Sequence, residues 1–148
     1  MNWLGKAALG AGGVAVLIQL VSFDRTNPPV TGEVEAPAEV KALLSRACYD
    51  CHSNQSVWPW YSKVAPVSWL VHRDVTEGRK HLNFSTWTQV SPERKAKKLG
   101  EVVEELQDGE MPPWFYLPMH PEAKLTPAEQ ETLIRWAKAA AGPAAEKD

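Results

Sequence analysis

The sequence predicts an all-α domain preceded by one N-terminal transmembrane helix, and three features of its 148 residues support this fold class. No run of alternating β-branched residues suggests a sheet. Several segments begin with a proline or a capping residue and continue with apolar residues at helical spacing. The stretch from Trp3 to Phe23 is apolar apart from Lys6 and Gln19. Twelve prolines and nine glycines indicate long ordered loops between the helices.

Residues 1–23 form the first of four predicted segments, a membrane anchor or signal sequence. The apolar stretch is long enough to span a bilayer. Lys6 precedes it, and Asp24 and Arg25 follow it, so the positive-inside rule leaves the amino end in the cytoplasm and exports the rest of the chain. A cleaved signal sequence has the same charge pattern. Because no small-x-small cleavage site follows the apolar run, we favour an uncleaved anchor.

The remaining segments are a linker, a folded domain and a tail. Residues 24–36 contain two adjacent prolines, a glycine and two glutamates with few apolar residues, which predicts an extended linker. Residues 37–142 are expected to form the exported domain, and residues 143–148 a disordered tail. The net charge of −2 gives no electrostatic reason to expect nucleic acid as a partner.

The first two helices of the domain are predicted from prolines and apolar spacing. Pro37 opens a short helix that leads directly into Cys48. Residues 63–80 are predicted as a second helix, with Pro66 in its first turn and Gly78 as its end. Its apolar stripe consists of Val67, Leu70, Val71 and Val75.

Two further helices have clear start and stop signals. Ser91-Pro92 is a cap followed by proline at the first helical position, and Gly109 ends that helix. Thr126-Pro127-Ala128-Glu129 is a capping box that begins the last helix. We expect this last helix to pack against the one that precedes Cys48.

The chemically distinctive stretch is Cys48-Tyr49-Asp50-Cys51-His52, since Cys-x-x-Cys-His is the attachment signature of c-type haem. Two thiols three residues apart on one helical turn can each form a thioether with a haem vinyl group. The following His52 can then ligate the iron. The motif predicts one covalently attached haem c, held by Cys48 and Cys51 and ligated by His52.

Other uses of a Cys-x-x-Cys pair fit this sequence less well. A thioredoxin-like redox pair follows a buried strand, and no Val/Ile-rich strand precedes Cys48. A structural zinc site needs four ligands at closer spacing than His72 and His81 offer. A disulfide between Cys48 and Cys51 would close too small a loop to stabilise much.

Large aromatic residues follow the motif in the loop 53–62. Trp58, Trp60 and Tyr61 could pack on the porphyrin and exclude water, or they could form the core of a loop-rich domain. Because the loop begins next to His52, we expect at least one of the three to contact the haem.

The stretch Met111-Pro112-Pro113 suggests the sixth iron ligand. A thioether sulfur is a soft iron ligand, and the prolines, beginning with Pro112, would stiffen the backbone that presents it. We therefore predict Met111 as the distal ligand, with His120 as its main rival. A vacant position and three other side chains also remain open: Met119, His72 and His81.

Taken together, these residues resemble the bacterial haem-binding domain family that has a Cys-x-x-Cys-His motif. The matching segments are the motif itself, Trp58-Pro59-Trp60-Tyr61-Ser62, Ala65-Pro66-Val67-Ser68-Trp69, Gly78-Arg79, Leu82 to Trp87, Met111-Pro112-Pro113 and His120 to Leu125. The order of helix, motif, Gly-x-Met-Pro and terminal helix is also similar to class I cytochrome c. This resemblance implies a cytochrome c-like helical fold, with His52 as the proximal ligand and Met111 as the distal one.

These expectations combine into one hypothesis, an exported c-type cytochrome tethered to the bacterial inner membrane by a single span. Its haem domain would lie on the periplasmic side and pass single electrons between membrane or periplasmic redox proteins, without enzymatic activity of its own. A haem peroxidase-like enzyme or a haem-based sensor, each with an open or exchangeable sixth position, is the alternative. Because the domain is small, we expect the haem-free chain to be poorly folded.

Overall fold

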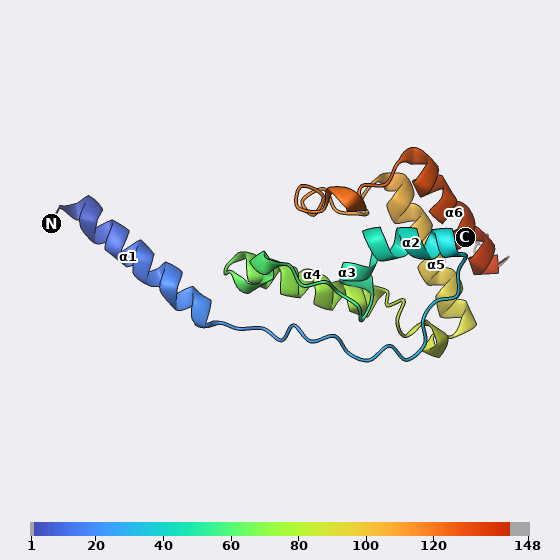
Figure 1. The fold of residues 1–148 in the computed structure, drawn as a ribbon, viewed down its shortest axis with the longest axis horizontal. Coiled ribbons are helices and arrows are strands. Elements are labelled where there is room, and N and C mark those ends of the chain that lie inside the picture. The colour runs from blue at the N-terminus through green and yellow to red at the C-terminus, as the bar shows by residue number, and fades with distance from the viewer. Residues whose placement is uncertain (1, 143–148) are drawn as a thin grey trace.

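A computed structural model describes residues 2–142 of the chain (Figure 1). Within these residues it contains helices and loops but no β-strand, and a single isolated bridge joins Gly32 to Thr86. The all-α prediction is confirmed. The α-helices are α1 (Trp3–Leu17), α2 (Ala38–Ala47), α3 (Tyr49–His52), α4 (Val67–His81), α5 (Pro92–Asp108) and α6 (Pro127–Ala141). Short 3₁₀ helices are η1 (Ile18–Leu20), η2 (Trp60–Lys63), η3 (Trp87–Gln89) and η4 (Pro121–Ala123). The predicted tail, residues 143–148, lies outside the described residues.

Most of the N-terminal helix projects away from the domain (Figure 1). The stretch Trp3–Leu20 has a mean hydropathy of 1.4, and none of it is buried. In length and composition it is apolar enough to cross a membrane. This exposed apolar helix has the character that a signal sequence or a membrane anchor requires.

The linker predicted at residues 24–36 is extended, and hydrogen bonds join both of its halves to the domain. The backbone N–H groups of Thr31 and Gly32 donate to the carbonyl of Ser85, and Val34 N–H donates to Phe84. The side chain of Val34 is only 1% exposed. Burial of this valine anchors the linker to the domain before α2 begins.

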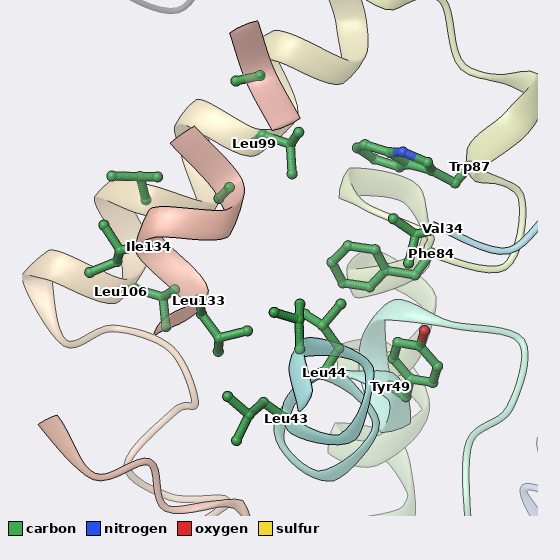
Figure 2. Packing of buried hydrophobic residues seen from close by; sticks show 14 of the residues in the cluster. Val34, Leu43, Leu44, Tyr49, Phe84, Trp87, Leu99, Leu106, Leu133 and Ile134 are labelled. Carbon is green, nitrogen blue, oxygen red and sulfur yellow. The ribbon is translucent and has the colours of Figure 1, made fainter. Parts of the chain in front are cut away.

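The hydrophobic core lies at the end of the domain formed by α2, α5 and α6. Figure 2 shows Leu44, Leu99 and Leu133 from these helices facing one another, with Phe84 and Trp87 closing the cluster. The terminal helix α6 packs on α2, as expected, and more extensively on α5. Burying such large apolar side chains supplies most of the stabilisation of this half.

The predicted helix termini at α5 and α6 are confirmed by their capping contacts. The Ser91 hydroxyl accepts from Arg94 N–H, and Gly109 closes α5 with a left-handed φ of 73°. The capping box is complete, since Thr126 accepts from Glu129 N–H and the Glu129 carboxylate accepts from Thr126 N–H. These bonds satisfy groups that the helix ends would otherwise leave unpaired.

The expectation that Gly78 ends the second helix is wrong. Helix α4 continues through Gly78 to His81. A Cβ atom at Gly78 would lie 2.6 Å from the backbone oxygen of Cys51. The glycine is needed because it lets α4 approach α3 closely, which is a packing role and not a terminating one.

Candidate functional site

The two cysteines of the motif lie at the junction of α2 and α3. Cys48 caps α2, and its carbonyl accepts from His52 N–H at 2.8 Å, so the motif forms one helical turn. The cysteines are not bonded to each other. Burial raises the pKa of both thiols to about 12, and the Asp50 carboxylate adds to the effect at Cys51. At neutral pH both thiols are therefore protonated.

The imidazole of His52 is held in one tautomer by backbone carbonyls from the end of α4. Its Nδ1 lies 3.0 Å from the oxygen of Gly78 and 3.2 Å from that of Leu82. Because carbonyl oxygens only accept, Nδ1 donates and Nε2 keeps its lone pair. Burial also lowers the pKa of His52, which favours the neutral ring. A neutral imidazole fixed through Nδ1 is the form that ligates iron.

A cavity of about 360 Å³ lies beside the motif. Its walls come from the loop after the motif, the first half of α4 and the segment 115–120. Six of its lining residues concern the predicted site: Cys51, Trp58, Trp60, Tyr61, Met119 and His120. The three predicted aromatic residues are thus brought together with one cysteine. Cys48 packs against the edge of the hydrophobic core, and neither it nor His52 lines this cavity.

The predicted distal residue lies elsewhere. Met111 and Pro112 follow α5, and neither lines the cavity. The Met111 side chain is 39% exposed, and its N–H donates to Glu105 at the end of α5. Of the two other histidines, His72 stacks on Phe23 with ring centroids 4.4 Å apart, and His81 ends α4. His120 and Met119 are therefore the two candidate distal residues that border the cavity, and the identity of the distal ligand remains a prediction.

A chain of hydrogen bonds ties the segment 115–120 to the motif. The Tyr116 hydroxyl donates to Asp50 Oδ2 at 2.6 Å, and Asp50 Oδ1 accepts from Val57 N–H at 2.8 Å. The Tyr116 ring stacks on His120, with centroids 4.0 Å apart and planes 7° from parallel. Burial and the Asp50 carboxylate raise the pKa of Tyr116, so its hydroxyl keeps its proton.

His120 makes contacts on both ring nitrogens. Its Nδ1 lies 3.2 Å from a Glu122 carboxylate oxygen, and its Nε2 lies 2.5 Å from the Tyr61 hydroxyl. A carboxylate only accepts, so in the neutral ring Nδ1 donates and Nε2 accepts from Tyr61. Sequence reasoning missed Asp50 and Tyr116, because neither residue has a local pattern that predicts a partner 66 positions away.

One polar group in the cavity wall has no partner. Trp58 Nε1 is buried and makes no hydrogen bond, although the Arg79 guanidinium lies 5.9 Å from the ring. A buried N–H without an acceptor is costly. A haem would provide a flat apolar surface for the aromatic walls of the cavity and a vinyl group for Cys51. The residues that line the cavity fit this group.

Comparison with known proteins agrees with this fit. The family model described as a haem-binding domain matches residues 13–139. No curated protein and no solved structure matches the chain. Among residues 2–142, no group of three or more His, Cys, Asp and Glu side chains could hold a metal ion by itself. Since the family model covers most of the sequence, including the motif and every cavity wall, the chain belongs to the haem-binding domain family.

Proposed function

We propose that the chain is a membrane-tethered, exported c-type cytochrome that carries single electrons through one covalently attached haem. The observation that supports this most is the position of Cys51, a motif thiol that borders a cavity with aromatic walls. When bound, haem supplies a one-electron redox centre.

The chain's own residues would bind this group and set its surroundings. Cys48 and Cys51 would form the two thioethers, and His52 Nε2 would ligate the iron. Nδ1 donates to the carbonyls of Gly78 and Leu82. These bonds fix the orientation of the imidazole and also make Nε2 a more basic ligand. Aromatic walls from the loop 58–61 would limit water access, which raises the reduction potential of a haem.

The sixth ligand is proposed to come from the segment 111–120. We favour His120 because it lies on the cavity wall. Met111, the ligand predicted from the sequence, is the alternative. Ligation through His120 Nε2 would require the Tyr61 hydroxyl to give up its bond to that nitrogen. If His120 could move between the iron and the Tyr61 hydroxyl, the sixth position would open. The bond between Tyr61 and His120 therefore suits a second candidate function, a haem sensor or peroxidase-like enzyme.

The apolar helix α1 supports a proposed cellular location. Retained as an anchor, it would tether the haem domain to the bacterial inner membrane on the periplasmic side, where redox proteins of the membrane or periplasm would exchange electrons with it.

Optical and EPR spectra of the ferric, haem-loaded protein test the proposal. We expect a low-spin ferric haem in the parent and a high-spin haem in His120→Ala, with Met111→Ala unchanged. If the far-red methionine-to-iron charge-transfer band is present and is lost in Met111→Ala, the distal ligand is Met111. A high-spin parent that binds cyanide or carbon monoxide rapidly would contradict the electron-carrier function and support the second candidate.

A further inference from the structure

The end of the apolar N-terminal helix is bonded directly to the domain. Gln19 Oε1 accepts from Ala65 N–H at 2.9 Å, and Gln19 Nε2 donates to the Ala65 carbonyl at 3.1 Å. One side-chain amide thus satisfies both polar groups of one backbone residue, just before α4. A pair of hydrogen bonds of this kind fixes the orientation of the Gln19 amide relative to the Ala65 backbone as well as the distance between them.

Two contacts further along the chain, at Phe23 and Arg25, continue this attachment. The Phe23 ring stacks on His72 at the middle of α4, and Arg25 Nε donates to the Ser62 carbonyl in η2 at 3.1 Å. In Figure 1 the helix α1 ends beside the end of the domain where α4 begins, whereas α5 and α6 lie at the opposite end. The η2–α4 end of the domain is therefore held close to the point where the apolar helix stops.

Exposed apolar side chains surround the junction between Gln19 and Ala65. Their exposed fractions are 77% for Leu20, 50% for Val21, 44% for Val64 and 38% for Trp69. We name these four residues the junction patch. None of them lines the cavity, so a bound haem would not cover them. Trp69 lies three residues before His72 on α4, which puts it on the same side of the helix as the Phe23 contact.

We propose that the junction patch rests in the interfacial layer of the lipid bilayer that α1 spans. The apolar stretch has 18 residues and no buried part. At 1.5 Å per residue it extends about 27 Å, close to the thickness of the hydrocarbon core, so its end at Leu20 lies at the membrane surface. Residues within hydrogen-bonding distance of Gln19 then lie at nearly the same depth.

The chemistry of the patch suits a lipid surface. Tryptophan is favoured where hydrocarbon meets headgroups, and Trp69 is half exposed at this depth. Lys63 is exposed next to Val64, and its ammonium suits the lipid phosphates. The same end of the domain includes η2, whose Trp60 and Tyr61 line the cavity. Part of the cavity wall therefore lies at the end of the domain that is nearest the proposed membrane surface.

Site-directed spin labelling of the full-length, haem-loaded protein in nanodiscs of phosphatidylethanolamine and phosphatidylglycerol tests this inference, which rests on the proposed membrane tether. The thioethers occupy both native thiols, so one introduced cysteine takes the label. We compare Trp69→Cys with Lys97→Cys, an exposed position on α5 at the far end of the domain. Val64→Cys serves in place of Trp69→Cys if that variant folds poorly.

We expect the ratio of collision rates with oxygen and with nickel-EDDA to be at least threefold higher at position 69 than at position 97. Adding Gln19→Ala should lower that ratio at least twofold, because the junction no longer holds the patch against the lipid. Equal ratios at the two positions in nanodisc-bound protein would overturn the inference and leave the tether intact, indicating a patch exposed to water or to a protein partner. If the full-length protein does not co-elute with nanodiscs, the tether itself fails, and the inference with it.

Discussion

Tyr61 and His120 share a hydrogen bond of 2.5 Å at the cavity wall, although 59 positions separate them in the sequence. Tyr61 belongs to the aromatic loop after the motif, and His120 to the segment that follows α5. With the bond between Tyr116 and Asp50, this contact closes the segment 115–120 over the cavity. Asp50, a residue of the motif, therefore holds the segment 115–120 in place at the cavity wall through its bond to Tyr116.

In the haem-free chain, where His120 keeps its bond to Tyr61, Tyr61→Phe should loosen this closure while keeping the ring that lines the cavity. A neutral hydrogen bond of this kind contributes about 1 kcal/mol, so amide exchange of residues 115–120 should become about fivefold faster. Hydrogen exchange with mass spectrometry measures this change. Exchange in α5 serves as the internal control, and an unchanged rate in residues 115–120 would show that the Tyr61 bond does not hold the segment.

Gly78→Ala should destabilise the domain. The new Cβ would lie 2.6 Å from the Cys51 carbonyl oxygen, a contact that must push α4 away from the motif. We expect the free energy of unfolding to fall by about 1–3 kcal/mol and the yield of attached haem to fall with it. Urea unfolding and haem content measure these losses.

Gly100→Ala is the matched control for that variant. Nothing lies within 4 Å of a Cβ at Gly100, which is also inside a helix. Alanine there should stabilise the protein by about 0.5–1 kcal/mol, because alanine favours helix formation over glycine. Equal effects of the two substitutions would contradict the close packing of α4 on α3.

The Cys48 thiol, which packs against the core cluster, should react slowly in the haem-free chain. Only thiolates are alkylated, and burial raises the pKa of Cys48 from 9.0 to about 12. A raised pKa lowers the thiolate fraction at any pH below 12, so labelling by iodoacetamide at pH 8 should be at least tenfold slower than in urea. The rate should keep rising between pH 9 and pH 12. Fast labelling at pH 7 would instead indicate an activated, thioredoxin-like pair.

Haem removal should affect the two halves of the domain differently. The sequence predicts a poorly folded haem-free chain because the domain is small. The buried cluster around Leu44, Leu99 and Leu133 lies outside the cavity, so it needs no haem to exclude water. In Cys48→Ala/Cys51→Ala we therefore expect exchange protection to survive in α5 and α6 and to disappear in the loop 56–61. Uniform loss of protection would show that the core cluster depends on the cavity.

Features that depend on near neighbours can be read from the sequence alone. The helix ends at Ser91, Gly109 and Thr126 follow from capping bonds that span three or four residues, and apolar spacing marks the buried faces of α2 and α5. The haem motif is local as well, because one helical turn brings its cysteines together. Such features need no knowledge of the rest of the fold.

Contacts between distant segments become known only from the folded chain. Nothing near Gly78 in the sequence shows that Cys51 packs against it, and a mid-helix glycine has the same local signature as a helix stop. The loop 111–120 contains Met111, Met119 and His120, and its closure by Tyr116 puts the last two on the cavity wall. Likewise Gln19 meets Ala65 because the linker runs along the domain to α2 and the chain then returns to the end near α1 (Figure 1). Such contacts depend on how whole elements pack and which buried polar groups they satisfy, and no short stretch of sequence contains that information.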